Sequence, residues 1–115
     1  MTAEPRLAAH MQVSAFIRKA SAGGDFAAVL RKGDAISGAI LLIGLVRGAN
    51  PRIFERFPSL NGSSLWQSVH GTEPISTADV AKMIEKRTSR DPDLWVIELD
   101  AADDERLNGL LTFGD

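Results

Sequence analysis

Eight consecutive residues without a polar side chain, from Ala39 to Val46, constrain the fold of this chain more than any other feature of its sequence. The run shows almost no alternation, and its β-branched members are Ile40, Ile43 and Val46. This pattern is typical of a strand that is covered on both faces, because a strand with one face in water alternates. The run is also far shorter than the roughly 20 residues that a membrane-spanning helix needs. We therefore expect 39–47 to form a strand inside a sheet.

Other segments with strand patterns flank this run. They are rich in apolar residues, are bounded by turn residues, and comprise 26–32, 52–57, 63–70 and 94–99. The glycines and short polar residues of 33–38 predict a hairpin loop into the central strand, and 48–51 predict a second turn. Asn61-Gly62 is the strongest two-residue hairpin signal, so the strands around it should pair. We expect the strand 94–99 to be a partner of the central one.

Two segments have the period of an amphipathic helix. Apolar residues recur from Val13 to Ala20 with the spacing of one buried stripe, which predicts a helix over 12–22. A second helix is predicted over 77–89, because Ser76 is a good N-cap residue and an Asp-Pro pair stops the pattern.

The whole chain of 115 residues is expected to be a single domain. Residues 1–10 have no clear period and are predicted to be an irregular N-terminal arm, while 101–115 are predicted to be a loosely ordered tail. Leu107, Leu110 and Leu111 can anchor a short helix in that tail. The predicted fold class is α+β, with a mainly antiparallel sheet of about five strands and two helices packed on one face.

Composition excludes several classes of function. The chain has no cysteine, which excludes disulfides, thiolate metal sites and a cysteine nucleophile. Its two histidines lack partners at metal-ligand spacing, and its glycines form no phosphate-binding loop. We therefore expect no metal site, no cofactor and no catalytic residue.

The first residues lack the apolar segment of a secretory signal, so the expected location is cytoplasmic, with no membrane partner.

Two stretches of the chain carry a family resemblance. They are Gly24 to Asp34, which reads GDFAAVLRKGD, and Asp91 to Leu99, which reads DPDLWVIEL. With 13–20 and 38–41, they resemble a family of short alphaproteobacterial proteins classed as domain of unknown function 1491. The similarity runs from about residue 6 to residue 99 and is looser over 51–72. The resemblance implies a bacterial cytoplasmic setting and carries over no catalytic residue.

Our leading hypothesis for function is a non-enzymatic accessory or protein-interaction domain. It would self-associate through a sheet edge or through a patch containing Trp66 or Phe54. A second hypothesis is the binding of nucleic acid or another polyanion, although a pI near 5.6 disfavours a dedicated nucleic-acid binder. A third is a small enzyme centred on His70.

The candidate interaction surface combines the aromatic, histidine and basic residues of these hypotheses. Its members are Phe54, Trp66, His70, Arg52, Arg56, Lys82, Lys86 and Arg90. The five basic residues of this set would bind a polyanion if the fold brought them together. The last three recur every fourth residue and therefore share one face of the predicted helix 77–89.

Overall fold

A computed structural model describes residues 7–58, 64–71 and 73–112 of the protein. Most of the predicted N-terminal arm, the Asn61-Gly62 turn and the last three residues lie outside the described residues. Three helices and five strands follow one another in the order α1 (Ala9–Ala22), β1 (Phe26–Arg31), β2 (Ile40–Val46), β3 (Ala49–Pro58), β4 (Ser64–Ser68), α2 (Thr77–Arg90), β5 (Trp95–Ala101) and α3 (Asp104–Thr112).

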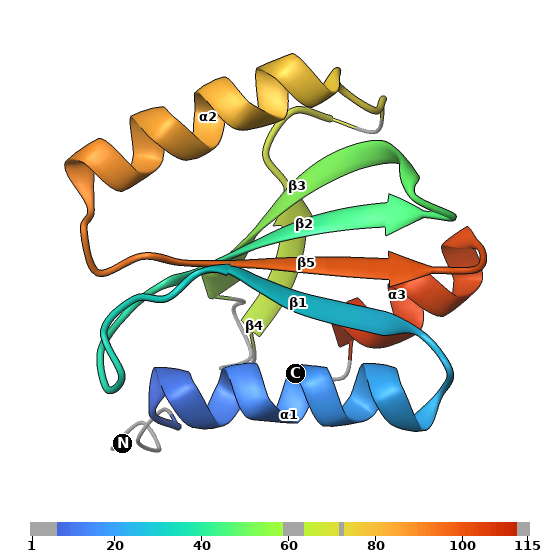
Figure 1. The fold of residues 1–115 in the computed structure, drawn as a ribbon, viewed down its shortest axis with the longest axis horizontal. Coiled ribbons are helices and arrows are strands. Elements are labelled where there is room, and N and C mark those ends of the chain that lie inside the picture. Colours follow the sequence, from blue (N-terminus) through green and yellow to red (C-terminus); the bar gives the residue numbers. More distant parts are fainter. Residues whose placement is uncertain (1–6, 59–63, 72, 113–115) are drawn as a thin grey trace.

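The five strands form one sheet in the order β1-β5-β2-β3-β4 (Figure 1). The sheet is mixed, because β2 and β5 run parallel while the other neighbouring pairs are antiparallel. The prediction that 94–99 pairs with the central strand is confirmed. The expectation of a mainly antiparallel sheet holds for three of the four strand pairs, and the β2–β5 pair departs from it. The expected hairpin of β1 with β2 is wrong, since β5 lies between these two strands.

The loop 33–38 is therefore a connection past the start of β5 and not a hairpin turn. Its glycines are needed for close approach. A Cβ on Gly33 would lie 2.7 Å from the carbonyl carbon of Leu94, and one on Gly38 would lie 2.8 Å from Cδ1 of Trp95. The backbone N–H of Asp34 donates to the carbonyl of Asp93 at 3.0 Å. The loop is thus fixed to the segment that leads into β5.

The sheet is covered on both faces. On one face, Ile40 and Leu42 pack in a cluster with residues of α1 and α3. On the other, Leu41 and Ile43 pack in a second cluster with Val80 of α2. Figure 1 shows α1 and α2 on opposite sides of the sheet. The prediction of two helices on one face is wrong, because a central strand with no polar residue needs cover on both sides.

Local hydrogen bonds fix the starts of α1 and α2, and buried leucines anchor α3. The first N–H groups of α1 donate to carbonyls of the loop 33–38, from Ala9 to Ile36 at 3.1 Å and from His10 to Ala35 at 2.9 Å. These bonds let the helix begin before residue 12, where it was predicted. The predicted cap of α2 is present, since the Ser76 hydroxyl accepts from the N–H of Asp79 at 3.0 Å. In α3, the predicted anchors Leu107, Leu110 and Leu111 are buried.

The turn between β2 and β3 lies earlier than the predicted turn at 48–51. Arg47 and Gly48 both have positive φ, at 52° and 74°, which is typical of a two-residue type I′ hairpin. The N–H of Gly48 donates to the carboxylate of Asp100 at 3.0 Å. Asn50 and Pro51 consequently belong to β3, which begins at Ala49.

Candidate functional site

The basic residues of the predicted polyanion surface do not form one patch. Arg52 and Arg56 lie on β3 and contact aromatic rings of the face that α1 and α3 cover. Lys82, Lys86 and Arg90 are exposed on α2, which packs on the opposite face. The α2 stripe was predicted correctly as one side of a helix. The sheet separates the two groups.

The side chains of Arg52 and Phe54 contact other residues of the fold. The guanidinium of Arg52 lies over the ring of Phe54, 5.7 Å from its centroid, and forms an ion pair with Asp104 of α3 at 2.8 Å. Phe54 is only 7% exposed and belongs to the core cluster of α1 and α3. Its side chain is therefore not accessible as an interaction anchor.

His70 binds the backbone next to it. Its Nε2 accepts a hydrogen bond from the N–H of Ile53 at 3.0 Å, and the N–H of Val69 donates to the Ile53 carbonyl at 3.0 Å. These two bonds continue the pairing of β3 beyond the end of β4. The His70 side chain is half-buried, and its hydrogen bond to the N–H of Ile53 fixes it to β3.

Trp66 is the centre of a cluster at the β4 edge. The guanidinium of Arg56 lies over its ring, 4.7 Å from the centroid, and the ring meets Phe16 of α1 edge-to-face with centroids 5.7 Å apart. Within the described residues, the buried indole nitrogen Nε1 of Trp66 has no hydrogen-bond partner. The tryptophan therefore has a packed ring and an unused donor.

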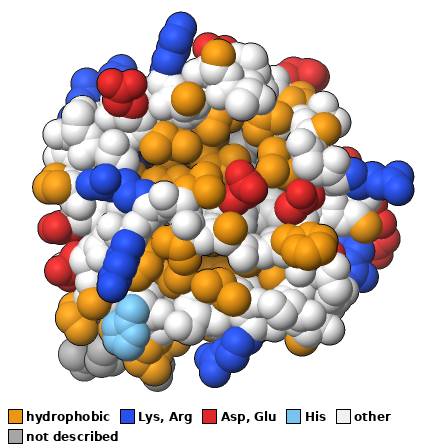
Figure 2. All heavy atoms as spheres, viewed as in Figure 1, with side chains coloured by type: hydrophobic (Ala, Val, Ile, Leu, Met, Phe, Trp, Pro, Cys, Tyr) orange, Lys and Arg blue, Asp and Glu red, His pale blue; other side chains and the backbone are white. Residues whose placement is uncertain are grey.

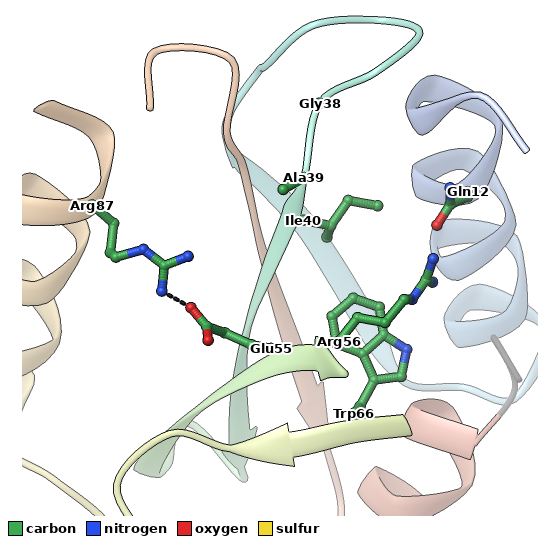
Figure 3. Close-up of a pocket in the computed structure, with 8 residues that line it drawn as sticks. All are labelled: Gln12, Gly38, Ala39, Ile40, Glu55, Arg56, Trp66 and Arg87. Carbon is green, nitrogen blue, oxygen red and sulfur yellow. Dashed lines mark ion pairs between the residues drawn. The ribbon is translucent and has the colours of Figure 1, made fainter. Parts of the chain in front are cut away.

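This cluster borders a cavity of about 180 Å³. Its walls come from α1, the start of β2, β3, β4 and α2, and consist of Gln12, Gly38, Ala39, Ile40, Glu55, Arg56, Trp66 and Arg87 (Figure 3). Of the predicted surface, only Arg56 and Trp66 line this pocket. Arg87 forms an ion pair with Glu55 on the far side of the segment 38–40 from Trp66 (Figure 3).

Sequence reasoning missed three polar residues of the pocket, namely Gln12, Glu55 and Arg87. Each comes from a different element, at the end of the sheet where β3 extends past the start of β2. Gln12 lies on the Trp66 side of the segment 38–40, and Glu55 and Arg87 lie on its other side (Figure 3). Gln12 donates from its side-chain nitrogen to the carbonyl of Leu7 at 2.6 Å. Its side-chain oxygen is buried and, among the described residues, accepts no hydrogen bond. The only sequence signal for Gln12 was a polar residue beside the apolar stripe of α1.

A second surface feature lies at the opposite edge of the sheet. Every large apolar side chain that is exposed in the described part of the chain lies between residues 7 and 36, and the set comprises Leu7, Met11, Phe26, Val29, Leu30 and Ile36. Phe26, Val29 and Leu30 belong to β1. Figure 2 shows hydrophobic side chains in the open middle of the face between α2 and β1, with acidic side chains among them.

Among residues 7–58, 64–71 and 73–112, no three His, Cys, Asp or Glu side chains come together in a way that would hold a metal ion. None of the helices in these residues has the length and apolar character of a membrane-spanning segment.

Comparisons with known proteins give a family and a fold. A family model described as a protein of unknown function (DUF1491) matches residues 7–108. A crystal structure of a DUF1491 family protein from Caulobacter crescentus CB15 has a TM-score of 0.74 and 33% identity, covering 85% of this chain and 91% of that one. An NMR structure of a DUF1491 family protein from the same organism has the same TM-score and identity, with coverage of 92% and 93%.

A third solved structure is similar. It is a solution structure of a protein from A. tumefaciens, with a TM-score of 0.72 and 27% identity over 89% of this chain and 92% of that one. A search of curated proteins found no match.

Proposed function

The chain belongs to the DUF1491 family, whose function is unknown, and from this premise we propose that it is a non-enzymatic interaction domain that self-associates through β1. The setting of this role is the bacterial cytoplasm, as the family resemblance implies. The observation that carries the proposal is the presence of three of the six exposed large apolar side chains of the described residues, Phe26, Val29 and Leu30, on the edge strand β1. Monomeric domains rarely expose contiguous apolar surface, and such surface is typical of interaction sites.

The strand β1 is an unprotected edge. It lies at one end of the sheet and pairs only with β5. Residues 26–30 carry no charge and no proline, whereas natural edge strands usually carry one or the other as protection against pairing. Phe26 is 74% exposed. The pairing with β5 is regular from Phe26 to Val29, and its register shifts between Val29 and Arg31, at the end of the segment that a second strand would join.

A second copy of this chain is the occupant that fits the edge. An antiparallel pairing of β1 with itself, centred on Ala28, places Phe26 of one copy opposite Leu30 of the other. The same pairing places Ala27 opposite Val29. Both cross-strand pairs are apolar, and such pairs stabilise a sheet. The arrangement is symmetric, as most homodimer interfaces are, and it joins two sheets of five strands into one.

The other edge of the sheet fits a partner strand less well. In β4, Trp66 is packed against Phe16 and Arg56, and the polar residues Gln67 and Ser68 follow it along the strand. The proposed contact surface on β1 differs from the patch containing Trp66 or Phe54 that the sequence suggested. The side chain of Phe54 is buried and does not form part of such a patch.

Sedimentation velocity over a concentration series tests the proposal. The natural chain should sediment as a dimer, and the double variant Phe26→Lys, Leu30→Lys should sediment as a monomer, because four lysines would then face one another across the twofold axis. Both replaced side chains are exposed, so the fold should persist in circular dichroism. The control is Ile36→Lys, which removes an equally exposed apolar side chain off the strand and should leave the dimer intact. A natural chain that stays monomeric, or a control as disruptive as the double variant, contradicts the proposal.

A further inference from the structure

We infer that the pocket bordered by Trp66, Arg56 and Gln12 binds a small organic anion that carries a carboxylate and a neighbouring hydroxyl group. The site is separate from the β1 edge, because β5 and β2 lie between β1 and the strands β3 and β4 that supply Arg56 and Trp66. The inference therefore does not depend on self-association.

The pocket has the size of a site for a small molecule. Its volume of about 180 Å³ compares with about 30 Å³ for one water in the liquid. Figure 3 shows Arg56, Trp66 and Gln12 on one side of the segment 38–40, and Glu55 with Arg87 on the other. Ala39 and Ile40 supply an aliphatic wall between them. A short carbon chain fits such a space, and a nucleotide does not.

The charge of the lining favours an anion. Two guanidinium groups, of Arg56 and Arg87, border the cavity against one carboxylate, of Glu55. Glu55 is paired with Arg87. The guanidinium of Arg56 lies over the Trp66 ring, 4.7 Å from its centroid, which limits the directions from which it can meet a carboxylate. The indole N–H of Trp66 is a second donor in the same wall, and it lacks an acceptor among the described residues.

Gln12 adds a requirement that a simple anion does not meet. Because its side-chain nitrogen is committed to the carbonyl of Leu7, the oxygen is the atom left for the pocket. An oxygen acceptor needs a hydrogen-bond donor, and buried polar atoms in folded proteins are generally paired. A ligand that presents both a carboxylate and a hydroxyl would contact the Arg56 guanidinium, accept from the Trp66 indole and donate to the oxygen of Gln12. An α-hydroxy carboxylate is the smallest class with both groups.

The two tryptophans make the test internally controlled. In a proton–nitrogen correlation spectrum, the chain gives two indole signals, which Trp66→Phe assigns. The indole of Trp95 donates to the carbonyl of Asp34 and is not part of the pocket lining, so its signal serves as the reference for shifts that do not come from contact with the ligand. Titration with glycolate should shift the Trp66 signal in a saturable way and leave the Trp95 signal in place. Acetate, which has the carboxylate without the hydroxyl, should bind more weakly at the same signal.

Two variants locate the interaction. Arg56→Gln should weaken glycolate binding by about tenfold or more, the usual effect of losing a charge-assisted hydrogen bond. The matched control is Arg52→Gln, because Arg52 lies on the same strand and also stacks on an aromatic ring but is absent from the pocket lining. Gln12→Leu should abolish the preference for glycolate over acetate.

Three results would overturn the inference. The first is a Trp66 signal that glycolate does not shift saturably, and the second is a loss of affinity in Arg52→Gln equal to that in Arg56→Gln. The third is equal affinity for acetate and glycolate in the natural chain, which removes the role of Gln12. The titration is repeated on the Phe26→Lys, Leu30→Lys variant, and the same affinity is expected there. A failure of self-association thus stays distinguishable from a failure of the pocket.

Discussion

The indole nitrogen of Trp95 donates a hydrogen bond to the backbone carbonyl of Asp34 at 2.7 Å. The backbone N–H of Trp95 also donates to the carbonyl of Ala39 at 2.8 Å, beyond the other end of the loop 33–38. The two stretches that carry the strongest family resemblance, 24–34 and 91–99, therefore meet in space. Their residues fix the loop that in turn receives the first N–H groups of α1 and leads to the pocket wall at 38–40.

The two tryptophans should differ in their contribution to stability. Trp95→Phe shrinks a buried side chain and leaves the half-buried Asp34 carbonyl without its donor, and we expect it to lower the free energy of unfolding by about 2 kcal/mol or more. Trp66→Phe removes an N–H that has no partner among the described residues and keeps a ring against Phe16, so the expected loss is less than about 1 kcal/mol. Urea unfolding measures both values. Equal losses would show that the Asp34 contact is of no consequence.

The same substitution should have opposite effects at two glycines. A Cβ on Gly38 would press against Trp95 and the Asp93 backbone, so Gly38→Ala should destabilise the fold by about 2 kcal/mol or more. Gly109 lies within α3, and a Cβ there meets nothing within 4 Å. Gly109→Ala should raise the free energy of unfolding by about 0.5–1 kcal/mol, because alanine favours the helix. Thermal unfolding of both variants checks the signs, and a tolerated Gly38→Ala would contradict the close approach of the loop to β5.

Asp34 should make stability depend on pH in the acid range. Hydrogen bonds from the backbone N–H and the hydroxyl of Ser37, and from the N–H of Ile36, hold the pKa of Asp34 below its ordinary value. A lowered pKa in the folded chain means that the carboxylate stabilises the fold above the ordinary pKa. This contribution is lost as the pH falls through the lowered value.

Unfolding of Asp34→Asn at a series of pH values checks the direction. The variant should be less stable than the natural chain at neutral pH, and the difference should shrink in acid. Ser37→Ala provides the control, since removing the hydroxyl should raise the pKa of Asp34 toward its ordinary value in a carboxyl-carbon NMR titration. A difference between the natural chain and Asp34→Asn that is constant across the acid range would refute this role.

Two arginine–carboxylate pairs should differ in importance. Arg106 of α3 reaches both oxygens of Asp25, at 2.9 and 3.1 Å, and also the carbonyl of Gly23. The Asp25 side chain is only 6% exposed, whereas the Asp104 partner of Arg52 is 75% exposed. Arg106→Ala leaves a charge with little water around it, so it should destabilise the fold more than Arg52→Ala.

A double-mutant cycle isolates the Asp25–Arg106 interaction. The loss in the Asp25→Ala, Arg106→Ala variant should be smaller than the sum of the two single losses, because the second substitution removes a group already without its partner. Strict additivity in urea unfolding would mean that the pair contributes nothing beyond its separate side chains.

Local patterns in the sequence predicted the elements better than their arrangement. The run 39–46 and the strand 94–99 form the interior of the sheet, and both predicted helices are present, because apolar period reflects burial directly. The pattern does not specify which strands are neighbours. The loop 33–38 contains residues typical of a hairpin turn, yet it passes the start of β5, a strand that comes much later in the sequence. Only the run 39–46, which has no polar side chain, indicated that helices must cover both faces of the sheet.

The candidate site was predictable only in part. Trp66 and Arg56 are directly opposite on paired strands, and their types alone suggested a role. Gln12, Glu55 and Arg87 reach the same pocket from separate elements, and no spacing along the chain indicates such a meeting. Lys82, Lys86 and Arg90 share a helix face as expected, but the path of the chain puts the sheet between them and Arg52.

The place of β5 in the sheet bears on how the chain folds during its synthesis. This strand leaves the ribosome last among the five, and its residues Ile97 and Leu99 are completely buried between β1 and β2. Until residues 95–101 emerge, β1 has no strand to pair with and β2 lacks one of its two neighbours. A nascent chain that ends after α2 would present apolar strand edges to its surroundings, the condition in which chains aggregate or engage chaperones. The domain therefore completes its fold only when nearly all of it has been translated.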